Sequence, residues 1–307
     1  MWKYAYLVLI GALASQCARP LSLQFVPADN AHLVYELSIN ADTQTQVMGM
    51  DIDTKTEQDM VYSMDCAPPS PIGDRVVTVV YNTIRMSQTM PQGTTYYNSD
   101  DPSTDDGGPI ASMMGAMIDQ PFTMVISSEG ETKSVKGLAE IVDHAIEQMS
   151  GLGEEAKEAM KAQFGGEAMT RNLKSITAFF PPNPVKIGES WENEQTVANG
   201  GMELIVNSLY TFVGREDGLA RIQVEGDILT NPDADAMEIM GMTFEYNLQG
   251  TQMGYILVDE NTGVAVHSAI TQAFMGNMTT DTPETGPMNL SLVVDNTIDI
   301  QLQEDQP

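Results

Sequence analysis

The chain has 307 residues, 42% of them apolar, so it is long enough to form one or two domains with a sizeable core. Its 43 acidic residues against 14 Lys and Arg give a formal net charge of −29. That charge argues against a nucleic-acid partner and against adsorption to anionic lipid headgroups, because both require a basic face. With two Cys and three His, neither a disulfide scaffold nor a multi-His metal centre is expected.

The first residues are typical of an export signal. Met1-Trp2-Lys3 is a short cationic start, and residues 4–14 form an apolar stretch too short to cross a bilayer. Cleavage after Ala14 follows the small-x-small rule, whereas LASQC resembles an imperfect lipobox in which Cys17 is lipidated. We favour lipidation, because a signal ending at Ala14 is very short; a retained anchor is the remaining alternative. The sequence therefore predicts a cell-envelope protein, lipid-anchored or periplasmic, that meets the membrane only through this anchor.

The second cysteine, Cys66, bears on this choice. If Cys17 carries lipid, Cys66 is a lone thiol. If it does not, an oxidising compartment allows a disulfide between Cys17 and Cys66. A small buried apolar residue is an equally good interpretation of Cys66, and the sequence leaves the three alternatives open.

From residue 31 to residue 125, apolar and polar residues mostly alternate, which indicates strands with one buried face. Strands are expected at 33–39, 47–52, 60–64, 75–86 and 122–127. The segment 98–109, NSDDPSTDDGGP, is an acidic loop rich in Gly and Pro, expected to be solvated.

The period then changes to that of helices. Residues 136–149 carry one apolar stripe with gaps of three and four, and further helices are expected at 154–164 and 167–179. A second β-rich half follows, with strands expected at 203–213, 219–228, 242–248, 255–258, 265–274 and 288–302. Hairpin turns at 214–218 and 259–263 favour antiparallel pairing over a parallel fold.

The predicted fold class is α+β and β-dominated. It is one large curved antiparallel sheet in two β-rich halves, with a half-barrel as one form, and a helical insert at about 134–180. Whether the sheet closes is left open. The predicted organisation is a signal peptide at 1–16, a linker at 17–30, and a single domain over 31–307, divided into 31–133, 134–180 and 181–307.

The most distinctive segment is 180–191, FPPNPVKIGESW. The form F/L-P-x-x-P-V-x-x-G-x-S-W, after helices and before a strand, resembles an uncharacterised family of exported bacterial proteins of about this length, common in Bacteroidota. The segment 254–263, GYILVDENTG, is similar to that family's G-x-x-x-x-D-x-x-T-G turn. The resemblance covers residues 30–303. Because the family has no known activity, the resemblance implies no functional residue.

Both motifs are interpreted as structural. Prolines stiffen a corner after the helices, glycines permit turns, and a large aromatic residue anchors the next strand. Structural roles are expected for Pro181, Pro184, Gly188, Trp191, Asp259 and Gly263.

No catalytic motif is present in the sequence. It has no G-x-S-x-G, H-E-x-x-H, phosphate loop or dinucleotide fingerprint. With 43 acidic residues, a pair of carboxylates can be chosen at will and carries no information. We therefore expect a protein that is not an enzyme and has no cofactor or resident metal. An enzyme whose groups converge from distant positions would leave no local motif and stays an alternative.

Methionine is the compositional oddity, with 22 residues. Thioethers in clusters can hold Cu(I), but Met also fills irregular core gaps and lines adaptable apolar pockets. Packing explains two clusters, because Met48 and Met50 are expected on one face of a strand and Met237 and Met240 on one face of a helical turn. The other clusters are Met113, Met114 and Met117, and Met275 and Met278.

The leading hypothesis is an exported envelope protein with a non-catalytic role. It binds a hydrophobic small molecule or an envelope protein on a curved β-sheet, and no nucleic acid. A Met-rich periplasmic copper-binding protein is the alternative, beside the motif-free enzyme. A ligand carrier requires a concave apolar face open to solvent, whereas a structural module fills that face with its own side chains.

Overall fold

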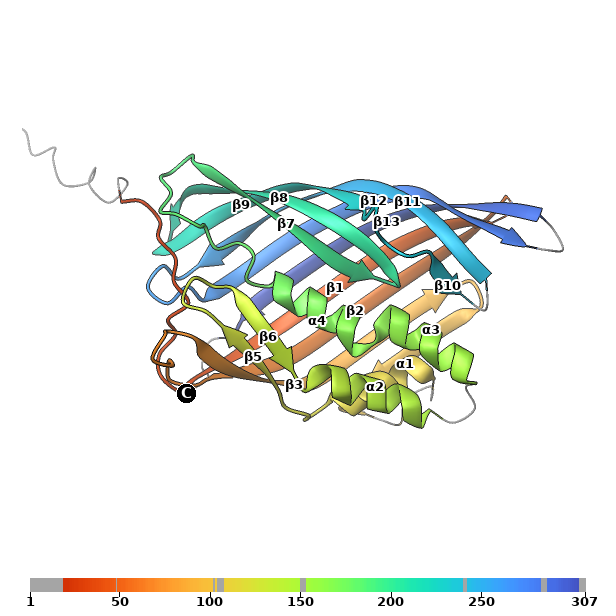
Figure 1. Ribbon diagram of the computed structural model, residues 1–307, viewed down its shortest axis with the longest axis horizontal. Coiled ribbons are helices and arrows are strands. Elements are labelled where there is room, and N and C mark those ends of the chain that lie inside the picture. Colours follow the sequence, from red (N-terminus) through yellow and green to blue (C-terminus); the bar gives the residue numbers. More distant parts are fainter. Residues whose placement is uncertain are drawn as a thin grey trace, which may run out of the picture.

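The computed structural model describes residues 19–303 except 48, 102, 104–107, 150–152, 240–241 and 283–285. Antiparallel strands dominate it, with four helices among these residues (Figure 1). The predictions of signal cleavage at Ala14 and lipidation at Cys17 lie outside the described residues. Within the part described, no helix is both long enough and apolar enough to cross a membrane.

The first half of the chain supplies six strands and a short helix. Their bounds are β1 Ala31–Val47, β2 Met50–Cys66, β3 Arg75–Met90, β4 Gly93–Asn98, α1 Pro109–Met117, β5 Phe122–Ile126 and β6 Thr132–Lys136. Three helices follow: α2 Leu138–Gln148, α3 Glu154–Phe164 and α4 Gly166–Ser175. The second half consists of β7 Ser190–Asn199, β8 Met202–Glu216, β9 Leu219–Thr230, β10 Met237–Ile239, β11 Met242–Val258, β12 Ala265–Thr282 and β13 Gly286–Leu302.

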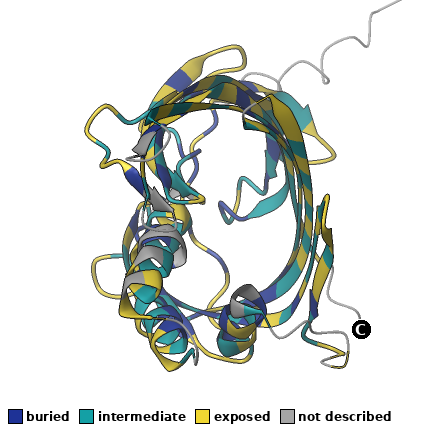
Figure 2. Cartoon of the chain, turned by 90° about the vertical axis from the view of Figure 1, so that its right-hand side faces the viewer, coloured by how far each residue is buried: buried dark blue, intermediate teal, exposed yellow. Residues whose placement is uncertain are grey.

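The strand order is β6-β5-β3-β2-β1-β13-β12-β11-β9-β8-β7, with β4 paired to β3 and β10 to β11. The first and last long strands, β1 and β13, therefore pair in the middle of the sheet and join the two halves of the chain. The free edges are β6 and β7, and α4 contacts both of them. Figure 2 shows the sheet curling round toward the helices, which occupy the gap between its edges. The sheet is thus large, curved and antiparallel, as predicted, and pairing of the described strands does not close it.

Several predicted strands are parts of longer ones. The segments predicted at 242–248 and 255–258 belong to one strand, β11. They were predicted apart because the intervening inner positions, Gly250, Gln252 and Gly254, give no apolar signal. The predicted strand 47–52 instead contains a hairpin turn with Gly49 at φ +79°, so that β2 begins at Met50. The turn predicted at 214–218 is narrower, because β8 extends to Glu216.

Two local predictions about helices were wrong. Helix α1 was not expected, because it directly follows the predicted acidic loop and is short. It starts with Pro109 and buries Met113 and Met117. Met237 lies in strand β10 and not in a helical turn, because it pairs with Phe244 of β11. Met240 lies outside the described residues.

The core consists of two separate clusters of buried side chains. The larger one lies where α1, α2 and the N-terminal residues Leu21, Leu23 and Phe25 pack on the inner face of the sheet. The smaller one centres on Phe274, Leu248 and neighbouring side chains beside β10. The stretch of inner face between the two clusters therefore decides whether the sheet has room for anything else.

Candidate functional site

The corner motif begins with a short bridge to the N-terminal segment. Leu21 and Val185 exchange two backbone hydrogen bonds, at 2.6 and 2.9 Å, directly after the exposed Pro184; Pro181 is half-buried. Gly188 has φ +87° and donates its N–H to the Phe212 carbonyl at 2.7 Å. Trp191 is buried and stacks on Tyr210 with ring centroids 5.7 Å apart.

The second motif meets the first one around the N-terminal segment. Asp259 accepts hydrogen bonds from the Asn261 N–H at 2.9 Å and the Thr262 hydroxyl at 3.0 Å. Gly263 has φ +68°, and a Cβ there would lie 2.2 Å from the Gln24 carbonyl oxygen and 3.2 Å from the Phe180 ring. Chain packing thus accounts for these motif residues. Pro184 and Trp191 also line a hollow of about 440 Å³, together with Asn183, Glu189 and Ser190.

Cys66 is buried at 1% exposure, and its thiol is free. Burial raises the pKa of this thiol to about 11; nearby Arg75 opposes the rise and Asp65 adds to it. The side chain is therefore a neutral thiol near pH 7, typical of a small apolar core residue.

Two of the methionine clusters consist entirely of described residues. Met275 is exposed on the outer face of β12, whereas Met278, three residues on, is buried on the inner face. Met113 and Met117 are buried in the larger core cluster. Strand alternation separates Met275 from Met278, and core packing accounts for Met113 and Met117.

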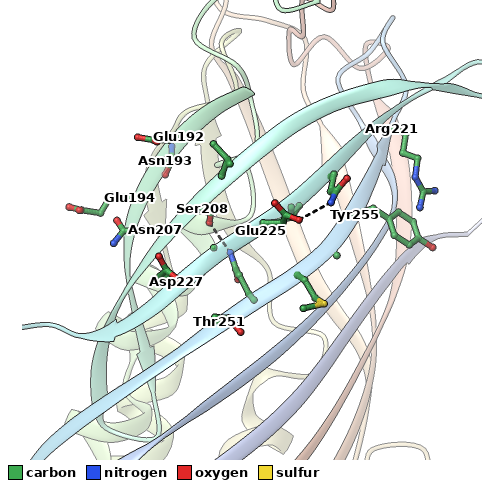
Figure 3. A pocket seen from close by; sticks show the side chains of 17 residues that line it. Glu192, Asn193, Glu194, Asn207, Ser208, Arg221, Glu225, Asp227, Thr251 and Tyr255 are labelled. Carbon is green, nitrogen blue, oxygen red and sulfur yellow. Dashed lines mark hydrogen bonds between the residues drawn. The ribbon is translucent and has the colours of Figure 1, made fainter. Parts of the chain in front are cut away.

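A hollow of about 980 Å³ lies on the outer face of β7, β8, β9 and β11 (Figure 3). Carboxylates surround it, from Glu192, Glu194, Glu225 and Asp227. Its one cation, Arg221, pairs with Glu216 at 2.8 Å and lies over the Tyr255 ring at 4.1 Å. No group of His, Cys, Asp and Glu in the part of the chain described is arranged to hold a metal ion. The hollow is thus a solvated acidic surface.

A hydrogen-bonded trio lies beside this hollow on the outer face. The Tyr255 hydroxyl is 3.3 Å from His267 Nδ1, and His267 Nε2 is 3.0 Å from Asp299 Oδ2. Cross-strand neighbours on an exposed face commonly pair in this way. The trio fixes the His267 ring, and the hollow does not enclose it.

The inner face of the sheet has the opposite character. Two arginines lie at its end beside the N-terminal segment, where Arg75 pairs with Asp29 and Arg215 with Glu260. Apart from these two, no described inner position of the strands from β3 round to β7 carries a charged side chain. In a chain with 57 formal charges, this absence defines a continuous uncharged surface.

Part of this uncharged face is apolar and only half-buried. We call it the central apolar patch: Leu37, Ile39, Met60, Met86, Ile270, Ile298 and Ile300. Ile39 pairs with Ile298, which pairs with Ile270, so three β-branched side chains stand side by side. Leu37, Met60, Met86, Ile270 and Ile300 pack against the larger core cluster and stay half-buried, whereas Ile39 and Ile298 belong to neither cluster among the described residues. The chain's own side chains therefore leave this patch incompletely covered.

A polar row borders the patch on the side of the smaller core cluster. Strand register aligns one inner residue from each of nine neighbouring strands: Asn193, Ser208, Gly226, Gln252, Gln272, Asn296, Ala41, Thr56 and Gln88. We call this set the amide row. Gln252 reaches past Gly226, which has no side chain, and donates to the Ser208 hydroxyl at 2.8 Å. Gln252 and Ser208 are buried, at 8% and 3% exposure, and Gln272 and Asn296 are half-buried, so part of the row is a partly buried polar network.

Neither the patch nor the row was predicted from the sequence. The local signal was available, since Gln272 and Asn296 are polar residues at inner positions between apolar ones, as in Ile270-x-Gln272-x-Phe274. Their alignment across strands depends on register, which the hydrophobic pattern of a single strand does not give.

The chain belongs to the family of unknown function DUF6263, which residues 73–265 match, more than half of the chain. The expected resemblance to a family of unknown function is thereby confirmed. No curated protein matches the sequence.

Solved structures give weaker likenesses. One concerns lipid–protein interactions in lipovitellin, at TM-score 0.48 and 9% identity over 90% of this chain, which spans 25% of that chain. DynF from the dynemicin biosynthesis pathway of Micromonospora chersina has TM-score 0.22 and 8% identity, covering 96% and 90%. A DUF1329 family protein from Desulfovibrio piger has TM-score 0.16 and 10% identity, covering 89% and 87%. Likenesses at these values say nothing about function.

Proposed function

We propose that this protein is a non-catalytic carrier that binds a hydrophobic small molecule on the concave face of its sheet, over the central apolar patch. The observation that carries the proposal is an uncharged, half-buried apolar surface inside a chain of net charge −29. Binding sites for apolar ligands are concave and mostly apolar, with few polar groups. The acidic outer face keeps the protein dispersed and leaves the inner face for the ligand.

Two features of the patch support a ligand over a protein partner. Its residues lie on the inner faces of β1, β2, β3, β12 and β13, in the sheet that Figure 2 shows curling round the interior. The helices already occupy the gap between the sheet edges. A flexible or slender molecule reaches such a surface more readily than a folded domain does.

A neutral fluorescent probe, N-phenyl-1-naphthylamine, tests the proposal. Ile270→Gln places an amide in the patch with little change in size, and we expect it to weaken probe binding about tenfold. Met275→Gln is the matched control on the outer face of the same strand, where the side chain is 56% exposed. Equal binding by the two variants, or no binding by the wild type, contradicts the proposal.

Export and lipid anchoring are part of the same proposal and rest on residues 1–17. A carrier of apolar molecules in the cell envelope benefits from a lipid anchor, because the anchor holds it near the membrane that supplies them. Cys17→Ser should release the protein from the membrane fraction of its host. Unchanged membrane association in that variant contradicts the lipid anchor and leaves the carrier proposal to the probe experiment.

A further inference from the structure

The hydrogen bonds of the amide row run in one direction. Asn296 Nδ2 donates to Gln272 Oε1 at 3.2 Å, and Gln272 Nε2 donates to Gln252 Oε1 at 3.1 Å. Gln252 Nε2 then donates to the Ser208 hydroxyl at 2.8 Å. Each of these amides donates its N–H toward β8. The carbonyl oxygens of Gln272 and Gln252 are therefore both paired, and Asn296 stands at the start of the series.

The carbonyl oxygen at the start of this hydrogen-bond series is unpaired. Asn296 Oδ1 is buried and has no hydrogen-bond partner. Buried carbonyl oxygens almost always accept a hydrogen bond. A buried oxygen without a partner has lost its hydrogen bonds to water and gained none in return, which is unfavourable. A donor that does not belong to the protein would complete the hydrogen-bond network.

The unpaired oxygen borders the central apolar patch. Asn296 is two residues before Ile298 on the inner face of β13, and it pairs with Gln272, two residues after Ile270 on β12. A molecule lying on Ile270 and Ile298 therefore has one end next to Asn296. Beyond the row, Phe274 and Val294 are buried in the smaller core cluster, so the ligand cannot extend that way without displacing them.

The charge of the surroundings selects against ions. Neither the patch nor the row contains a charged side chain, and the nearest inner-face arginines, Arg75 and Arg215, are already paired at the far end. A carboxylate or ammonium group buried here would have no counter-ion, which is strongly unfavourable.

We infer that the concave face is specific for a neutral amphiphile whose hydroxyl or amide N–H donates to Asn296 Oδ1 while its apolar body covers the central apolar patch. This inference rests on the proposed carrier function and adds the chemical class of the ligand. It excludes fatty-acid anions and amphiphilic amines as preferred ligands.

Displacement of bound N-phenyl-1-naphthylamine by four compounds that share a ten-carbon chain tests the inference. Decan-1-ol and decanamide carry a donor, 1-methoxydecane carries only an acceptor, and sodium decanoate carries a charge. We expect the alcohol and the amide to displace the probe about tenfold better than the ether, which is the effect of one hydrogen bond to a buried acceptor. Decanoate should be the weakest competitor.

Asn296→Leu removes the acceptor and should abolish the difference between alcohol and ether. Asn277→Leu is the control, because Asn277 is an exposed amide on the outer face of β12. Asn296→Asp serves if the leucine variant does not fold: it keeps the shape and should raise the competitive strength of decylamine over that of decan-1-ol.

The outcomes separate the inference from the function beneath it. If the probe binds but decanoate competes as well as decan-1-ol, or if the preference persists in Asn296→Leu, the neutral-amphiphile inference is wrong and the carrier function stands. If the wild-type protein does not bind the probe, the carrier function fails and the inference fails with it.

Discussion

Alternate residues of the same strands build two surfaces with different chemistry. Along β2, the outer positions include Asp51, Asp53 and Asp59, whereas inner positions of the same strand include Thr56 and Met60. The outer face gathers carboxylates round an open hollow, and the inner face excludes charge and leaves apolar side chains partly uncovered. Charge and binding capacity are therefore divided between the faces by the period of two residues, and not between domains.

The largest expected effect concerns the inner face at alkaline pH. Tyr35 stacks on Tyr62 and Tyr62 meets Tyr81 edge-on, with centroids 5.3 and 6.2 Å apart. Burial raises the pKa of Tyr35 and Tyr62 above the usual range and that of Tyr81 to about 12; that of the Cys66 thiol rises to about 11.

Because each folded-state pKa is higher than the unfolded one, these groups stabilise the fold fully below about pH 9, and the contribution is lost as pH rises through their folded pKa values. We expect cooperative unfolding in the alkaline range, with tyrosinate absorbance at 295 nm and circular dichroism changing together. Tyrosinate signals from every tyrosine of the protein at unchanged circular dichroism would contradict this.

Two neighbouring residues of β12, one on each face of the sheet, allow the inner and outer faces to be compared directly. Phe274 is 2% exposed on the inner face and Met275 is 56% exposed on the outer face. Phe274→Ala should lower the free energy of unfolding by about 3–5 kcal/mol, because it opens a cavity in the smaller core cluster. Met275→Ala should change it by less than about 0.5 kcal/mol in the same urea titration. Equal losses would mean that the two faces are not distinct.

Gly226 tests the amide row itself. A Cβ at this position would lie 2.4 Å from the Asn207 carbonyl oxygen and 3.1 Å from Ser208 Cα. Gly226→Val should therefore cost about 1–3 kcal/mol of stability, through crowding and loss of the Gln252–Ser208 hydrogen bond. Asp227→Val, on the outer face of the same strand, is the control, measured by calorimetry under identical conditions. A neutral effect at Gly226 would show that the row tolerates a side chain in its middle.

The smallest effect is expected in the outer hollow. Glu194→Gln removes one exposed carboxylate and should change stability by less than about 0.5 kcal/mol. Binding of N-phenyl-1-naphthylamine should stay the same, because the probe is placed on the opposite face. A marked change in probe affinity would instead move the ligand site to the outer hollow.

Most strands of the fold could be predicted from the sequence, because alternation is a local signal. The strand 75–86 and the hairpin at 259–263 were predicted close to their observed places, and helix α3 was predicted with its observed bounds. Predictions failed where the local signal was weak. Strand β11 was predicted as two strands, because glycines at inner positions interrupt its apolar pattern. Helix α1 was too short and too evenly apolar to show a helical stripe.

The candidate site could be predicted only in part. A polar residue among apolar ones, such as Asn296 between Val294 and Ile298, is visible in the sequence. That Asn296 stands beside Gln272, and Gln272 beside Gln252, depends on the register of three strands. A shift of one residue in either pairing would turn the amide row to the outer face.

The sequence by itself determined the β-dominated class, the antiparallel pairing and the division of each strand into a charged and an uncharged side. These properties follow from composition, tight turns and a period of two, all of which act over a few residues. Only the tertiary structure decided that β1 pairs with β13, and thereby that Ile39, Ile298 and Ile270 adjoin one another in the curve of the sheet. That pairing joins residues about as distant as the chain allows, and its register is selected by burial of whole faces, which no local pattern encodes.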